Sequence, residues 1–192
     1  SVTVGGVDVR KLDYADLMKH ISIVFQDTNL FKMSVAENVA MYKPGASREE
    51  IMEVLRQAQC EDILEKLPNG VDSVIGARGV YLSGGEMQRI ALARAILKDA
   101  PIVLLDEATA FADAENEYLI QRALDILLHG KTVLMIAHRL QTIVHADQII
   151  VMQRGGIAEQ GTHEELMQRQ GVYAKMYHEY ENSVSWKIGG WA

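Results

Sequence analysis

The sequence predicts an α/β protein built around a mostly parallel sheet. Two apolar stretches of strand length, 102–105 and 132–137, alternate with helical patterns over 83–98 and 116–128. Alternating strands and helices are typical of parallel sheets, because a helix usually carries the chain from one parallel strand back to the start of the next. The stretch 102–105 is apolar on both faces, which predicts a strand in the middle of the sheet.

Spacing and caps predict the elements of the first half. Residues Val2–Val9 alternate and include two glycines, which predicts a strand that runs into a turn. The stretch Ile21–Phe25 is rich in β-branched residues and predicts a buried strand. Apolar residues at helical spacing predict one helix over Ser47–Lys66, and Ser47 with Glu50 forms the pattern of a capping box at its start.

The second half of the chain is predicted to contain a hairpin and a helix, and the patterns also indicate how the whole chain divides into parts. Residues 148–160 predict a hairpin, and 162–169 predict a helix with a Thr-x-x-Glu cap. The stretch 36–100 is mostly helical and interrupts the sheet, so we expect an inserted helical subdomain there. Residues 101–182 would form the rest of the core, and 183–192, which show no clear pattern, are predicted to be a tail.

Bulk properties exclude several classes of protein. The net charge of −7 argues against general nucleic-acid binding, which requires a basic face. No apolar run approaches the about 20 residues that span a bilayer, and the first residues lack the pattern of a signal peptide. The single cysteine, Cys60, excludes an intrachain disulfide and a thiolate cluster. These features fit a protein of the cytosol.

Two adjacent carboxylates, Asp106 and Glu107, follow directly after the predicted central strand. Ligands of α/β proteins bind at the carboxyl ends of the strands. One carboxylate there can hold Mg²⁺ through water, and the next can polarise an attacking water molecule. The alternative is that the two acids only cap the helix that follows.

The segment Ser83-Gly84-Gly85-Glu86 begins a predicted helix. Glycines at a helix start let the backbone approach a phosphate, and the free N–H groups and the helix dipole favour an anion. The alternative is a plain capping box made by Ser83 and Glu86. That alternative leaves two consecutive glycines unexplained, and each costs roughly 1 kcal/mol within a helix.

Two further polar residues come at strand ends. His138 follows the strand 132–137 and could contact a γ-phosphate or orient a water molecule. Gln26 follows the strand 21–25 and could ligate Mg²⁺ or water. Each of them alone is more simply a polar residue at the edge of a sheet.

Taken together, these residues resemble the nucleotide-binding domain of an ABC transporter, over nearly all of the chain from Val2 to about Tyr180. The resemblance implies a P-loop NTPase-like domain over residues 1–182. The matching segments are Leu82-Ser83-Gly84-Gly85-Glu86 with the signature motif, Ile102–Glu107 with the Walker B strand, Gln26 with the Q-loop, His138 with the switch histidine, and Gly161–Leu166 with the stretch after the last strands.

The resemblance implies ATP and Mg²⁺ as cofactors and a role for each site residue. Asp106 and Gln26 would hold Mg²⁺ through water, Glu107 would be the general base, and His138 would sense the γ-phosphate. Gln26 would also couple the ion to a membrane-spanning partner. Contacts with the nucleotide would come from Asp113 and from the signature residues Leu82, Ser83, Gly84, Gly85 and Glu86.

The resemblance also implies partners and a location. The signature of one nucleotide-binding domain closes on ATP held by a second, so hydrolysis requires a head-to-tail homodimer or heterodimer. The membrane-spanning partner would be a transmembrane domain in the same full-length chain, as in an exporter-like half-transporter. The domain would therefore lie at the cytoplasmic face of a membrane, and no nucleic-acid partner is expected. The transported substrate is not encoded in these motifs.

Three positions depart from the family pattern. Glu86 ends the signature, where glutamine is commoner, and adds a negative charge near phosphate unless its role as a helix cap turns it away. Ala110-Phe111-Ala112-Asp113 stands where the family usually has Ser-Ala-Leu-Asp. The stretch 73–79 resembles the coupling loop of exporters, but its usual glutamate is Ala77.

No segment of the 192 residues reads G-x-x-x-x-G-K-[ST]. Gly130-Lys131-Thr132 is a decoy, because Asp125 replaces the first glycine and the segment follows a helix and opens a strand. In the family the phosphate loop and its helix precede the segment that matches Val2–Val9. We therefore expect an exposed apolar sheet surface in this chain, and weak Mg-ATP binding without hydrolysis by these residues alone.

Two other functions compete with an ATPase domain. The chain could be a non-catalytic module that lends its signature to a partner with an intact phosphate loop. It could also be a soluble ABC protein of DNA repair or translation, against which the acidic charge and the exporter-like coupling loop argue.

Overall fold

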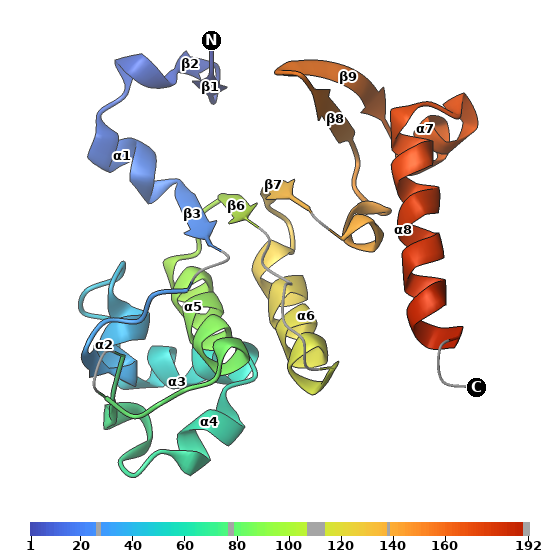
Figure 1. Ribbon diagram of the computed structural model, residues 1–192. Helices are drawn as coiled ribbons and strands as arrows, with labels where there is room; N and C mark the ends of the chain where they lie inside the picture. The colour runs from blue at the N-terminus through green and yellow to red at the C-terminus, as the bar shows by residue number, and fades with distance from the viewer. Residues whose placement is uncertain (26–27, 77–78, 107–113, 138, 190–192) are drawn as a thin grey trace. The chain divides into compact units, whose positions relative to one another are not determined.

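The computed structural model forms two compact units, 1–136 and 137–192, and each is described by itself. Figure 1 labels the helices and strands. The structure describes residues 1–25, 28–76, 79–106, 114–137 and 139–189, without the side chains of 114–115 and 183–189.

The first unit begins with a short antiparallel hairpin. Its strands β1 (Thr3–Val4) and β2 (Val7–Asp8) flank the two glycines of the predicted turn. A 3-10 turn, η1 (Val9–Lys11), leads to helix α1 (Tyr14–Lys19). Asp13 caps α1, since its carboxylate accepts the N–H groups of the next turn.

A three-stranded parallel sheet forms the middle of the first unit. Its strands are β3 (Ile21–Val24), β6 (Ile102–Asp106) and β7 (Thr132–Ile136), in the order β3-β6-β7. The register places Leu104 between Ile23 and Leu134. The predicted α/β fold is therefore confirmed, with β6 central among the described strands.

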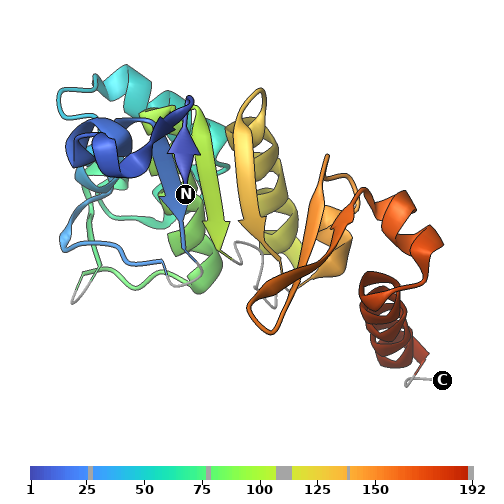
Figure 2. The ribbon, with the colours of Figure 1, turned by 90° about the horizontal axis from the view of Figure 1, so that it is seen from above.

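The two faces of this sheet differ in how they are covered. Helices α5 (Gly84–Lys98) and α6 (Ala114–Leu128) lie against one face, where Val103 is fully buried (Figure 2). On the opposite face Leu134 and Ile136 are 62% and 58% exposed. The unit thus presents an exposed apolar sheet surface, as the sequence led us to expect.

A mostly helical region connects β3 to β6. It packs into one continuous core with the covered face of the sheet, around the fully buried Leu55, Ile63 and Ile90. Its elements before α5 are β4 (Met33–Ser34), α2 (Val35–Ala40), α3 (Arg48–Gln57), α4 (Glu61–Lys66), the 3-10 turn η2 (Gly70–Asp72) and β5 (Val74–Ile75).

The prediction of one helix over Ser47–Lys66 is wrong, because the chain breaks between α3 and α4. Gln59 adopts a left-handed conformation with φ of 59°. The N–H of Cys60 donates to the carbonyl of Leu55 at 2.9 Å, which closes the end of α3. After Ala58 the helical spacing of apolar residues does not continue, because the positions three and four residues further on are Glu61 and Asp62. This change of pattern marks the break. The predicted capping box at Ser47 is confirmed.

The second unit consists of a hairpin and two helices. Its elements are η3 (Leu140–Ile143), β8 (Ile149–Gln153), β9 (Gly156–Gly161), α7 (His163–Arg169) and α8 (Val172–Gly189). The antiparallel pairing of β8 with β9 confirms the predicted hairpin, and Thr162 forms the predicted capping box of α7.

Helix α8 extends through residues 183–189, so much of the predicted tail is helical. No proline or glycine interrupts the chain there before Gly189, and a helix that has already formed extends at little cost. The carboxylate of Glu159 holds the start of α8, because it accepts the N–H groups of Val172 and Tyr173 at 2.9 Å each. Within the described part of the chain, no helix is both long and apolar enough to cross a bilayer.

Cys60 provides a test of this packing. Its thiol is fully buried at the break between α3 and α4, and burial raises its pKa to about 12. We expect no modification by a thiol reagent at pH 8 in the folded chain, and rapid modification in 8 M urea, because the thiolate is the reactive form. Rapid stoichiometric labelling without denaturant would show that this region does not pack as described.

Candidate functional site

The structure describes six of the ten predicted site residues. Five of them form the signature segment and one ends the central strand. Ser83 is the N-cap of α5, and Gly84, Gly85 and Glu86 form its first turn, while Asp106 is the last residue of β6. Leu82 is buried in the core ahead of the cap. The other four predicted residues lie outside the described residues: Gln26, Glu107, Asp113 and His138.

A capping box shapes the start of α5. The Ser83 hydroxyl oxygen accepts the N–H of Glu86 at 3.3 Å, and the Glu86 carboxylate accepts the N–H of Ser83 at 2.8 Å. The first N–H groups of a helix have no acceptor within the helix. The N–H groups of Gly84 and Gly85 occupy the first two positions of α5, where the helix dipole favours an anion.

Gly85 also has a packing reason to be glycine. It is buried, and a Cβ atom placed on it would lie 2.7 Å from the Cγ atom of Asn116 in α6. A larger residue would therefore push α5 and α6 apart. Helix packing accounts for this second glycine without a phosphate, so the argument for anion binding rests on Ser83, Gly84 and the free N–H groups.

A buried arginine outside the motifs named above braces the same helix. Arg89, one turn after the signature, is 1% exposed, and its guanidinium binds both carboxylate oxygens of Asp62 in α4, at 2.6 and 2.9 Å. It also donates to the carbonyl of Gln59 and, at 3.3 Å, to the side chain of Asn116. Arg89 thus ties the signature helix to α4 and α6.

Electrostatics support this brace. Partial burial acts to raise the pKa of Asp62, but the hydrogen bonds and charge of Arg89, with the charge of Lys66, outweigh it and hold that pKa below its usual value. Asp62 is therefore ionised at neutral pH, where it compensates the buried guanidinium. A search for polar residues at strand ends could not find Arg89, because it lies inside a helix.

Glu86 is held away from open solvent at the helix start. Its second carboxylate oxygen accepts a hydrogen bond from the ammonium of Lys66 at 3.1 Å, and its side chain is 14% exposed. Burial acts to raise the pKa of Glu86, but the bonds from Ser83 and Lys66 outweigh it and lower the pKa. The carboxylate is therefore ionised, and it acts as the helix cap that the sequence suggested.

Asp106 lies at the carboxyl end of β6, opposite Ile136 of β7 in the sheet register. A single strand-end carboxylate suits Mg²⁺, which needs few protein ligands and keeps its waters. Among the described residues, no hydrogen bond or ion pair joins Asp106 to residues 82–86, and no group of three metal-ligating side chains forms. The magnesium site with Gln26 and Asp106 therefore remains a prediction.

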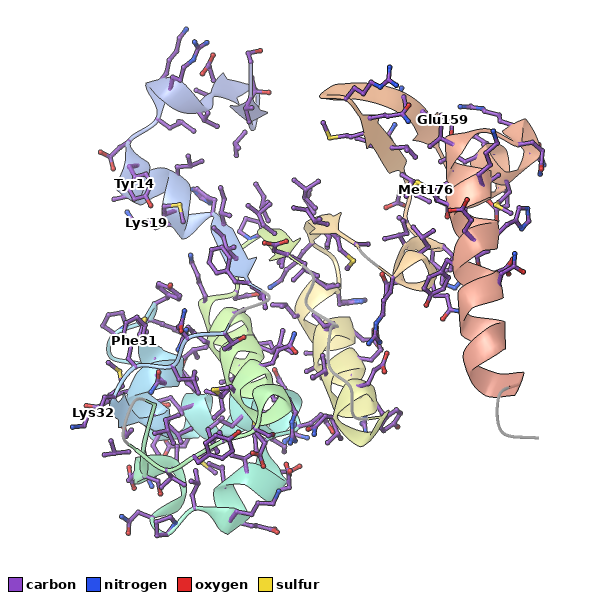
Figure 3. The ribbon with its side chains drawn as sticks, viewed as in Figure 1. Tyr14, Lys19, Phe31, Lys32, Glu159 and Met176 are labelled. Carbon is purple, nitrogen blue, oxygen red and sulfur yellow. The ribbon has the colours of Figure 1, made fainter. Side chains whose placement is uncertain are left out.

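A separate groove lies between α1, β3 and α5, with a volume of about 810 Å³. Aromatic rings line it, and Tyr14, Phe31 and Tyr42 are each more than half exposed. Figure 3 shows Tyr14 on α1 and Phe31 in the segment that follows β3. The groove borders the strand that leads to Gln26.

Two cations stand in the wall of this groove. The Lys98 ammonium donates to the carbonyl of Ile21 at 2.5 Å and lies 4.8 Å from the ring centroid of Tyr42. Arg94 donates to the main-chain carbonyl and the side-chain oxygen of Asn38 at 2.8 and 3.1 Å. Burial lowers the pKa of both groups. The groove therefore combines aromatic surface with partly desolvated positive charge.

Comparison with known proteins identifies the family. The model of the ABC transporter family matches residues 1–110, more than half of the chain, and the chain therefore belongs to that family. The nucleotide-binding domains of this family hydrolyse ATP, so the predicted class of nucleotide-binding ATPase is confirmed at the level of the family.

Two relatives cover most of the chain. The mycobactin import ATP-binding/permease protein IrtA of Mycolicibacterium smegmatis is 50% identical over 92% of this chain and 20% of its own length. The ATP-dependent lipid A-core flippase of Legionella pneumophila (strain Lens) is 48% identical over 92% of this chain and 30% of its own length. The chain therefore spans only 20% to 30% of the length of these relatives.

A solved structure supports the fold. The structure of a bacterial Atm1-family ABC exporter with ATP bound is 40% identical in sequence and superposes with a TM-score of 0.82. The superposition covers 91% of this chain and 30% of that one. The predicted P-loop NTPase-like α/β fold is thus confirmed.

Replacing Asp62 tests the brace of the signature helix. In Asp62→Ala the buried guanidinium of Arg89 loses its compensating charge, and we expect the free energy of unfolding to fall by about 2 kcal/mol or more. Asp72→Ala is the matched control, because Asp72 makes the same two-bond pair with Arg48 on the surface. Exposed pairs contribute little. Equal changes in urea denaturation for the two variants would contradict the role of Arg89.

Proposed function

We propose that this chain belongs to the ATP-binding and ATP-hydrolysing part of an ABC transporter. The observation that carries the proposal is the start of α5, where Ser83 caps the helix and Gly84 and Gly85 present free N–H groups. These are the features of an anion site at a helix N-terminus. Within the family they belong to the signature motif, which acts on ATP held by a second nucleotide-binding domain.

Each remaining site residue has a proposed role in hydrolysis. Glu107 takes the proton of the attacking water, and His138 contacts the γ-phosphate. Asp106 and Gln26 hold Mg²⁺ through water, and Asp113 lies beside the nucleotide. The bound ion would neutralise negative charge on the phosphates as the bond to the γ-phosphate breaks. Positioning of these side chains, rather than covalent chemistry, supplies most of the catalysis in such sites.

We further propose that the groove between α1, β3 and α5 is where a membrane-spanning partner docks, at the cytoplasmic face of a membrane. Three exposed rings provide apolar contact area, and the desolvated cations Arg94 and Lys98 suit a segment that carries a carboxylate. The strand beside the groove leads to Gln26, so movement of the partner can reach the predicted magnesium ligand. Neither the motifs of this chain nor its net charge supports a nucleic-acid partner.

Export is the proposed direction, and the substrate is not assigned. The exporter-like stretch 73–79 and the likeness to an Atm1-family exporter support export. One relative is named as an importer and another as a flippase, so relatives of similar identity carry out different transport tasks.

A second candidate function is a non-catalytic module that lends its signature to a partner. The specific observation in its favour is that the signature, the segment that would act in trans, is described in full, with Ser83 as the cap of α5 and Leu82 in the core. The two functions differ in whether Glu107 contributes to turnover.

A trans-complementation assay tests the signature. The chain is mixed with the nucleotide-binding domain of the Legionella flippase, in which the signature serine and first glycine have been replaced. We expect phosphate release that rises with the concentration of this chain and falls on the order of a hundredfold with Gly84→Asp, because the added carboxylate repels the phosphate and blocks the N–H groups.

Failure of the wild-type chain to restore phosphate release, at concentrations where the two proteins associate, would contradict the proposed function. Loss of turnover with Glu107→Gln would exclude the non-catalytic candidate, because a chain that lends only its signature does not use Glu107.

A retention assay tests the groove. The chain is expressed together with a tagged transmembrane part of the same flippase that lacks its own nucleotide-binding domain. We expect the wild-type chain to be retained and Tyr42→Asp to be lost, because the new carboxylate replaces apolar contact area in the groove. Tyr118→Asp is the control, since Tyr118 is 62% exposed on α6, outside the groove. Equal retention of both variants would contradict docking there.

A further inference from the structure

The signature of this chain carries a negative charge at its fifth position. Glu86 is ionised, and one of its carboxylate oxygens lies 2.8 Å from the main-chain nitrogen of Ser83. Under the proposed function, Ser83 contacts the γ-phosphate of ATP. A full negative charge this close to a polyphosphate would oppose binding, particularly in a site that closes and excludes water.

A lysine on the neighbouring helix meets that charge. The ammonium of Lys66, the last residue of α4, lies 3.1 Å from the outer carboxylate oxygen of Glu86. Glu86 thus accepts the cap bond with one oxygen and the lysine with the other. The hydrogen bond and charge of Glu86 raise the pKa of Lys66, so the pair is fully charged at neutral pH.

The position of Lys66 is fixed by the same helix that holds Arg89. Asp62 lies one turn before Lys66 in α4, binds the guanidinium of Arg89, and lies 3.7 Å from the Lys66 ammonium. Charges of alternating sign therefore run from Glu86 through Lys66 and Asp62 to Arg89. This network sets α4 against the first two turns of α5.

We propose that Lys66 is a positioning residue for ATP at the signature: it neutralises Glu86 and keeps that carboxylate on the helix cap, away from the phosphate. The inference rests on the proposed function, since it assumes that the start of α5 meets ATP. The new element is the role of α4, which compensates the charge of Glu86. This compensation allows a signature that ends in glutamate to replace one that ends in glutamine.

The chain contains a matched control for this arrangement. At the start of α3, Glu50 accepts the N–H of Ser47 at 2.8 Å and the ammonium of Lys43 at 2.6 Å. That is the same lysine-on-capping-box geometry at a helix with no proposed ligand. Lys43→Met therefore removes an equivalent ion pair and should reproduce any purely structural effect of Lys66→Met.

The test measures phosphate release in the trans-complementation assay as a function of ATP concentration. We expect Lys66→Met to raise the apparent KM for ATP roughly three- to tenfold with little change in kcat, because the uncompensated carboxylate acts on binding. In the Glu86→Gln background the carboxylate that Lys66 compensates is absent, so adding Lys66→Met there should not raise KM above the value of Glu86→Gln alone. Lys43→Met should leave KM unchanged.

The rescue by Glu86→Gln is the decisive result. If Lys66→Met raises KM as much in the Glu86→Gln background as in the wild type, or if Lys66→Met behaves like Lys43→Met, Lys66 does not act by compensating Glu86 and the inference is overturned. A loss of activity with Gly84→Asp in the same assay shows that the signature is in use. The further inference can therefore fail while the proposed function stands, and both fail if Gly84→Asp has no effect.

Ionic strength provides a readout that a structural role would not move, and titration tests the ion pair itself. Lys66 is 67% exposed, so salt screens its pairing and the difference in KM between wild type and Lys66→Met should shrink at 1 M salt. By NMR, the pKa of Glu86 should rise in Lys66→Met, because one of the groups that lower it is removed. An unchanged Glu86 pKa in that variant would contradict the pairing in solution.

Discussion

The buried guanidinium of Arg89 is the constraint on which the described site depends. It lies in the middle of the first unit, and only Asp62 among its bonded partners can balance its charge. A buried charge is tolerated only when it is paired and hydrogen-bonded. The hydrogen bonds that compensate this charge come from α4, from the break at Gln59 and from the first turn of α6, and they hold these three parts against the signature helix. Together with the apolar core that buries Ile90 and Leu92, Arg89 fixes the orientation of α5 and the direction of its first N–H groups.

The signature segment combines demands of packing and of ligand binding. Gly85 is required by the approach of Asn116, and the capping box would form at any helix start of this sequence pattern. Ser83 and Gly84 remain as the groups with capacity for an anion. The charge of Glu86 opposes that capacity, and Lys66 offsets it. The helical region between β3 and β6 therefore also supports the signature.

The sequence predicted the parts of this structure that depend on local rules. Strands β6 and β7 were predictable because their apolar runs are short and bounded, and the caps at Ser47 and Ser83 because their patterns are local. The break between α3 and α4 was not predicted, because no glycine, proline or asparagine marks the left-handed residue Gln59. The one local signal is that Glu61 and Asp62 interrupt the apolar spacing after Ala58. The ion pairs of Arg89 and Lys66 were not predictable either, because each joins residues 20 or more positions apart. Family motifs could place the signature but could not reveal what holds it.

The central claim is that the start of α5 contacts ATP held by another nucleotide-binding domain. The most direct test is a structure of this chain bound to a partner domain that is loaded with ATP and cannot hydrolyse it. We predict that the Ser83 hydroxyl and the N–H of Gly84 lie within hydrogen-bond distance, about 3 Å, of oxygens of the γ-phosphate. An ATP-bound complex in which the nucleotide lies away from Ser83 and Gly84 would contradict the account.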